Sequence, residues 1–144
     1  MSALNRIVLL ILFIGFSGCS LEESKKIELS DNEIEQLLIG SWYAPKAETK
    51  TGISSYTKDH KVSYIAFSDL ACTIPILTSL GDWEVIDGRL TITVTESSQH
   101  AYLTPGYVIT DKVISADHEN MILQAVSDDS IYSRTKINTC KKEG

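Results

Sequence analysis

The sequence predicts an all-β fold, a small antiparallel up-and-down β-barrel of about eight strands preceded by one short N-terminal helix. Short stretches rich in Val, Ile, Thr and Tyr recur from Ser41 onward, with turn-forming residues between them. One pair of stretches carries the signature of a tight hairpin, and a single helix start precedes them all. Consecutive hairpins without a long crossover favour a barrel, which also leaves no exposed sheet edge.

The helix is expected between Ser30 and Gly40. Ser30 is followed three residues later by a glutamate, which is the capping-box pattern of a helix start. Ile34, Leu37 and Leu38 then recur at helical spacing and predict one apolar face. Gly40 marks the end of the helix, because glycine readily adopts the positive φ found there.

The clearest strand pair spans residues 81–95 and turns at Asp87-Gly88. An Asp-Gly pair favours a two-residue type I′ turn, since both of its positions need positive φ. The register that this turn imposes gathers the large apolar side chains on one face: Trp83, Val85, Leu90, Ile92 and Val94. The opposite face carries Glu and Thr, so the turn chemistry and the alternation agree.

The remaining strands follow from composition and alternation. They are expected at residues 41–44, 53–57, 61–68, 107–115, 120–126 and 131–137. Residues 70–78 contain Pro75, so a strand there is expected to be irregular or at a sheet edge.

Residues 1–18 are expected to direct export. Arg6 precedes an apolar run at residues 7–16, which is too short to cross a bilayer but is typical of a signal peptide. Phe16-Ser17-Gly18-Cys19 resembles the lipobox of bacterial lipoproteins, although that family usually has Leu, Val or Ile at the position of Phe16.

The lipobox resemblance implies a membrane anchor and a location. Cys19 would carry the lipid as the first residue of the mature chain. In Gram-negative lipoproteins, Asp at the position of Ser20 usually acts as an inner-membrane retention signal, so Ser20 implies the outer membrane, facing the periplasm. In a Gram-positive cell the same sequence implies the plasma membrane. Residues 19–29 are short and charged, and we expect a tether before a single domain at residues 30–144.

The other two cysteines, Cys72 and Cys140, form an even pair. In an oxidising compartment such a pair predicts a disulfide that closes a loop of about 70 residues. The alternative is two buried free thiols.

Gly40-Ser41-Trp42 resembles the Gly-x-Trp signature of lipocalins and of bacterial lipocalin-like domains. The resemblance implies that Trp42 plugs one end of an eight-stranded barrel and that a basic residue of the last strand, Arg134, packs over it. A disulfide from the C-terminus to a mid-barrel strand also fits that family. The second lipocalin motif, Thr-Asp-Tyr, is absent, because Thr110-Asp111-Lys112 has Lys in place of Tyr.

The segment His100–Tyr107 is aromatic and holds a Pro-Gly turn. It forms either a loop at the barrel mouth or a hairpin connection with two core tyrosines, and the second interpretation is favoured.

Composition and spacing argue against several functions. The chain has a formal net charge of −6, and an acidic protein is a poor partner for nucleic acid. His60, His100 and His118 lack the spacing of zinc ligands. No nucleophile elbow or phosphate-binding loop is present, so no enzyme, metal or cofactor is expected.

Two functional hypotheses remain. In the first, the anchored barrel binds a small, apolar ligand in its interior. In the second, the interior is filled and the outer surface contacts an envelope protein or polymer, as an inhibitor would. Whether the interior is open or packed separates them.

Overall fold

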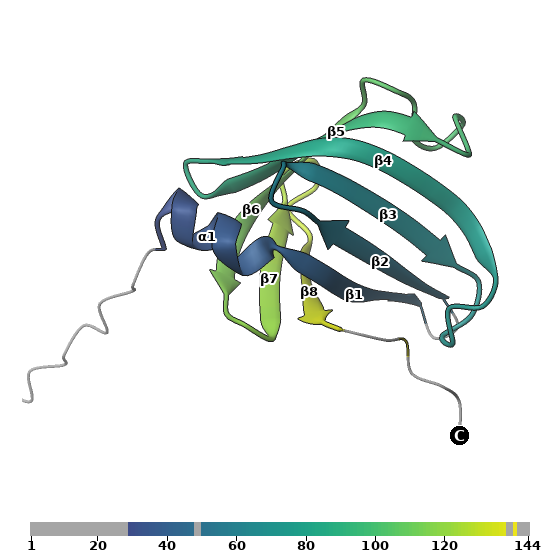
Figure 1. The fold of residues 1–144 in the computed structure, drawn as a ribbon, viewed down its shortest axis with the longest axis horizontal. Helices are drawn as coiled ribbons and strands as arrows, with labels where there is room; N and C mark the ends of the chain where they lie inside the picture. The colour runs from purple at the N-terminus through teal and green to yellow at the C-terminus, as the bar shows by residue number, and fades with distance from the viewer. Residues whose placement is uncertain (1–28, 48–49, 138–139, 141–144) are drawn as a thin grey trace, which may run out of the picture.

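The computed structural model describes residues 29–47, 50–137 and 140. Helix α1 (Asp31–Leu38) precedes all the strands. The strands are β1 (Gly40–Ala47), β2 (Lys50–Tyr56), β3 (Lys61–Phe67), β4 (Pro75–Ile86), β5 (Arg89–Ser97), β6 (Val108–Ala116), β7 (Asn120–Ala125) and β8 (Ile131–Lys136). Each pairs antiparallel with its chain neighbours, and β1 pairs with β8, which closes the barrel (Figure 1). The predicted fold class is confirmed.

Helix α1 begins and ends where its sequence signals predict. The Ser30 hydroxyl accepts a hydrogen bond from the Glu33 backbone N–H, and the Glu33 carboxylate accepts one from the Ser30 backbone N–H at 2.8 Å. The helix ends at Leu38, and Gly40 has a φ of 120° where β1 begins. Ile34 and Leu38 are buried, so the apolar face turns toward the barrel.

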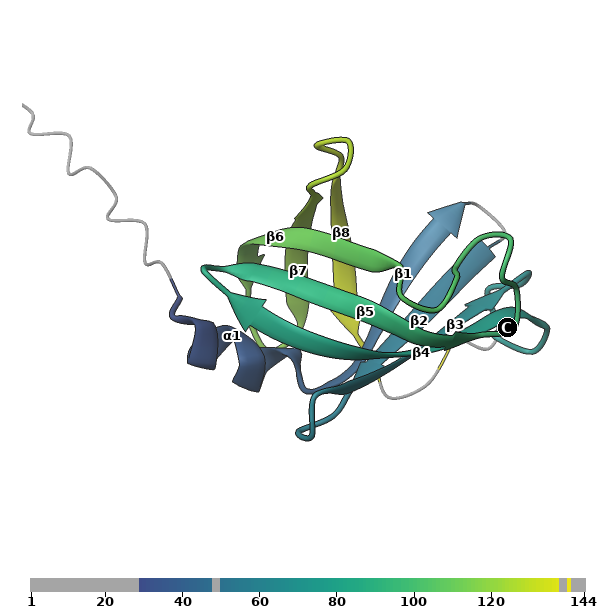
Figure 2. The same ribbon diagram turned by 90° about the horizontal axis from the view of Figure 1, so that it is seen from above.

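The β4–β5 hairpin lies beside the start of α1 (Figure 2). Its turn residues Asp87 and Gly88 have φ angles of 51° and 69°, as a type I′ turn requires. The Asp31 carboxylate accepts hydrogen bonds from the backbone N–H groups of Asp87, at 2.9 Å, and of Gly88, at 2.8 Å. One helical side chain therefore holds the helix against the hairpin.

Replacing Asp31 with alanine is expected to lower the free energy of unfolding by about 1 kcal/mol, because two backbone donors of the turn lose their acceptor. Urea denaturation measures the change. The exposed neighbour Asn32 provides the control, since Asn32→Ala removes a side chain with no such bonds. Equal stability of the two variants would contradict this role of Asp31.

The strand pairing of β4 and β5 follows the predicted register, with Val85 opposite Leu90 and Trp83 opposite Ile92. Strand β4 is longer than expected. It begins at Pro75, which is its first residue, and pairs with β3 on one side and β5 on the other, so it is not a sheet edge. Register irregularities at Ala66/Phe67 and Leu80/Gly81 allow this long strand to follow the barrel wall.

Large side chains fill the end of the barrel next to α1, which we call the helix end. The cluster contains Ile34, Leu38, Trp42, Tyr56, Val62, Trp83, Val85, Leu90, Met121 and Leu123. The Tyr56 and Trp83 rings meet edge to face, with their centroids 5.6 Å apart. This core leaves the opposite end, the mouth, where the β3–β4 and β5–β6 connections lie, free to hold a site.

Candidate functional site

A cavity of about 370 Å³ occupies the barrel between the packed helix end and the mouth. Its size is within the range of small-molecule pockets. The lining comes from most of the strands and from the β5–β6 loop: Ala44, Ser54, Val62, Tyr64, Ser79, Leu80, Gly81, Ile92, Val94, Leu103, Ile109, Tyr132, Ser133 and Arg134. The interior is thus packed at one end and open at the other.

Small residues at inward-facing positions create this space. Along β4 the buried positions alternate, and Ser79 and Gly81 follow the same inward face as Trp83. On β1, Ala44 lies two residues beyond the buried Trp42 and lines the cavity. Strands β1 and β4 therefore carry a large side chain near α1 and small ones toward the mouth, which leaves a volume that no side chain fills.

A charged group, the guanidinium of Arg134 on strand β8, lies within this largely apolar cavity. Arg134 Nη1 donates hydrogen bonds to Ser54 Oγ at 2.6 Å and to Tyr56 Oη at 3.2 Å. The guanidinium carbon lies 5.5 Å from the ring centroid of Tyr132. Tyr132 Oη in turn donates to Asp111 Oδ2 at 2.6 Å, and Asp111 is 2% exposed. These residues join β2, β6 and β8 across the barrel interior.

Burial sets the protonation of the network. Loss of solvation raises the pKa of Asp111 above its ordinary value, against the opposing effects of the Tyr132 hydrogen bond and the Arg134 charge. Burial also raises the pKa of Tyr132, so its hydroxyl remains protonated and donates at neutral pH.

The raised pKa of Asp111 predicts a specific pH dependence. The folded state prefers the protonated form, so the stability linked to Asp111 is complete below the unfolded pKa, about 3.9, and is lost as the pH rises through the folded value. As the pH rises from 3 to 7, the Tm of Asp111→Asn should therefore increase relative to the Tm of the wild type.

Thermal unfolding at a series of pH values tests this dependence. Asp117 is a control of opposite sign, because hydrogen bonds from the Glu119 and Asn120 backbones lower its pKa. Its linked stability is present at neutral pH and is lost as the pH falls, so Asp117→Asn should approach the wild-type Tm at low pH. A pH-independent difference for Asp111→Asn would contradict the assignment.

Trp42 plugs the helix end of the barrel as predicted, but the basic residue that packs over its ring is not the predicted one. Trp42 is fully buried, and its Nε1 donates to the Leu38 carbonyl at 2.7 Å. The cation over its ring belongs to Lys136, whose Nζ lies 4.9 Å from the ring centroid and donates to Leu37 O at 2.9 Å. The role predicted for Arg134 is therefore filled by Lys136, because the β1–β8 register sets Trp42 directly opposite Lys136.

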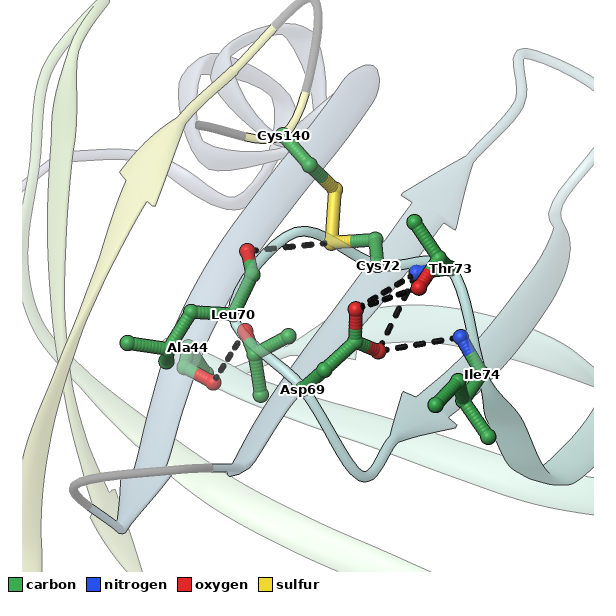
Figure 3. Close-up of a disulfide and its surroundings, with 8 residues drawn as sticks. Ala44, Asp69, Leu70, Cys72, Thr73, Ile74 and Cys140 are labelled. Atoms are coloured by element: carbon green, nitrogen blue, oxygen red, sulfur yellow. Dashed lines mark hydrogen bonds between the residues drawn. A yellow bond between two sulfur atoms is a disulfide. The ribbon is translucent and has the colours of Figure 1, made fainter. Parts of the chain in front are cut away.

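The predicted disulfide is confirmed. Cys72 in the β3–β4 connection is bonded to Cys140, with 68 residues of sequence separation (Figure 3). The Asp69 carboxylate holds the same loop, because it accepts hydrogen bonds from the backbone N–H groups of Thr73 and Ile74. The C-terminal segment is thus attached to the mouth end of the barrel.

The segment His100–Tyr107 forms part of the mouth and not a core connection. Tyr102 is 76% exposed and Tyr107 is 50% exposed, so the favoured interpretation of two core tyrosines is wrong. Leu103 is the residue of this loop that lines the cavity. Within this loop the tyrosines are therefore exposed, while Leu103 faces the cavity.

The remaining predictions concern the histidines, a metal site, membrane spans and the leader. His60 packs against Trp83, with ring centroids 4.9 Å apart. Within the described ranges, no group of three or more His, Cys, Asp or Glu side chains could hold a metal ion. None of the helices described there is long and apolar enough to cross a membrane. The predicted leader, Cys19 and most of the tether fall outside the described residues.

Comparison with solved structures shows a lipocalin-like fold. A lipocalin-like protein from Bacteroides uniformis is similar with a TM-score of 0.52 and 15% identity, over 70% of this chain and 99% of that chain. A protein from Bacteroides thetaiotaomicron has a TM-score of 0.46 and 18% identity, over 75% and 92% of the two chains. An uncharacterized protein from Bacteroides eggerthii has a TM-score of 0.46 and 16% identity, over 69% and 99%.

No protein-family model and no curated protein matches the chain. At such low identity the structural likeness concerns the fold, and the domain is a lipocalin-like barrel. The activity must be argued from the cavity itself.

The Asp111–Tyr132–Arg134 network was not predicted from the sequence. A signal was present, because Asp111 stands between Ile109 and Val113 in an alternating strand and so occupies an inward position. An acidic residue at such a position needs a buried partner. Which residue provides it depends on the pairing of β6, β7 and β8.

Proposed function

We propose that this chain is a lipid-anchored envelope lipoprotein whose barrel binds a small, largely apolar molecule. The cavity of about 370 Å³ is the observation that carries the proposal. Its lining combines aliphatic side chains with a few placed polar groups, which is the usual composition of a small-molecule site. The fold is compatible with ligand binding, and the cavity is the feature of this chain that supports it.

Filling the cavity tests the binding function. Ser79 points inward and lines the cavity, while its neighbour Thr78 is exposed on the same strand. Ser79→Phe is expected to weaken ligand binding at least tenfold, and Thr78→Phe should have little effect. Ligand is extracted for mass spectrometry from the processed chain, residues 19–144, made with Cys19→Ser so that it stays free of lipid.

The proposal is supported if the wild-type and Thr78→Phe proteins retain the same small molecule and Ser79→Phe does not. Wild-type protein that retains no molecule and binds none from an envelope lipid extract would contradict it.

The anchor rests on sequence, since Phe16-Ser17-Gly18-Cys19 resembles a lipobox. We place the lipid on Cys19 and the domain at the periplasmic face of the outer membrane, with residues 19–29 as the tether. Growth with a labelled fatty acid tests it. Cys19→Ser should lose the label and leave the membrane fraction, and a variant that keeps its label would refute the anchor.

A surface-binding role is the second candidate, and exposed apolar side chains around the mouth favour it. They include Ile74, at 57% exposure, Tyr102 and Ile131, at 67%. Exposed apolar side chains of this kind suit contact with an envelope protein. A partner captured equally well by wild type and Ser79→Phe would support surface recognition, whereas capture lost on filling the cavity would count against it.

A further inference from the structure

The guanidinium of Arg134 lacks a counter-charge in contact with it. Its Nε is buried and makes no hydrogen bond, while Nη1 donates to the hydroxyl oxygens of Ser54 and Tyr56. Over residues 29–47, 50–137 and 140, the one ion pair within 4 Å joins Lys61 to Asp82. The cavity therefore contains a cation that no described carboxylate touches.

The nearest acidic group in the network compensates this charge only indirectly. Asp111 is held by the hydroxyl of Tyr132, which stands between the carboxylate and Arg134. Burial disfavours ionisation of Asp111, which weakens its negative charge further. A buried cation without a paired anion is costly, so a negative group supplied from the cavity would be stabilising.

The rest of the cavity selects the remainder of the ligand. The lining is also aliphatic, from Val94, Leu103 and Ile109 on the mouth side and from Val62 and Ile92 nearer the helix end. Since one water takes about 30 Å³ in the liquid and a methylene group is of similar size, a cavity of about 370 Å³ holds roughly twelve non-hydrogen atoms. A longer chain would extend through the mouth.

We propose that the ligand is an amphiphile with a single anionic headgroup, such as a carboxylate, and a medium-length hydrocarbon chain. Arg134 binds the headgroup by charge-assisted hydrogen bonds, next to Ser54, and the hydrocarbon chain lies among the aliphatic lining residues. This inference rests on the proposed binding function and adds the chemical class of the ligand.

Three probes that share the same hydrocarbon tail separate the contribution of the headgroup to affinity from that of the tail. Decanoate, decanol and decyltrimethylammonium are titrated into the processed, lipid-free chain by calorimetry, below their micelle concentrations. Decanoate is expected to bind at least tenfold more tightly than decanol, and the cation more weakly still. Equal affinity for decanoate and decanol would overturn the headgroup assignment but leave apolar binding intact. No binding of any probe would count against the proposed function itself.

Substitutions then assign the preference to one residue. In Arg134→Gln the ratio of decanoate to decanol affinity should fall toward one, and Arg134→Lys should restore part of it. Asp111→Asn removes the negative charge that this carboxyl carries when it is ionised, and it should not lower decanoate affinity. Arg89→Gln is the matched control, since it removes an exposed arginine from the outer face of β5.

An unchanged ratio in folded Arg134→Gln would overturn the assignment. Should that variant fail to fold, Arg134→Lys decides the matter, because a ratio equal to that of the wild type would also overturn the assignment.

Discussion

Trp42→Ala should lower the free energy of unfolding by about 4 kcal/mol, since truncating a buried aromatic residue both exposes apolar surface and leaves a void. Trp42 is fully buried between the helix and the barrel floor. Its loss also leaves the Leu38 carbonyl without its donor and the Lys136 ammonium without the ring beneath it. At about 4 °C per kcal/mol for a domain of this size, the Tm should fall by roughly 15 °C.

Denaturant unfolding of Trp42→Ala and Trp42→Phe separates packing from hydrogen bonding. Trp42→Phe keeps a ring for Lys136 but has no Nε1 donor, so its loss should be about half as large. A loss below about 1 kcal/mol in Trp42→Ala would mean that Trp42 does not plug the barrel.

Removing the Cys72–Cys140 disulfide is expected to have an effect of similar size. The bond closes a loop with a sequence separation of 68 residues. In the chain-entropy model such a loop contributes about 4 kcal/mol, because the cross-link restricts the unfolded chain. The double variant Cys72→Ser/Cys140→Ser should therefore lose about 15 °C in Tm.

Reduction provides the control for this prediction. A reducing agent should lower the Tm of the wild-type protein to that of the double variant and leave the variant unchanged. The double variant should still bind decanoate, because neither cysteine lines the cavity. An equal Tm for oxidised and reduced wild type would show that the disulfide adds no stability.

Local signals predicted the parts of the fold that depend on neighbouring residues. The Asp87-Gly88 turn fixed the β4–β5 register, and the Ser30 cap fixed the start of α1. Both succeed because the interacting groups are a few residues apart, so their geometry depends little on the rest of the chain.

The cavity was less visible in the sequence, because on β4 its inward positions are not the apolar ones. Near the mouth, β4 buries Ser79 and exposes Leu80, at 47%. An alternation rule that places apolar residues inside would give the opposite orientation. The rule fails here because the inward residues must be small for the cavity to exist.

By itself the sequence determined an all-β domain with one capped helix, a tight hairpin and a cysteine pair, because turns, caps and alternation act over short distances. Only the tertiary structure decided which cation meets Trp42 and what surrounds Arg134. The pairing of β1 with β8 gives Lys136 to the tryptophan. The neighbouring strands then leave Arg134 facing an open cavity, since a barrel brings together strands whose register no single turn sets.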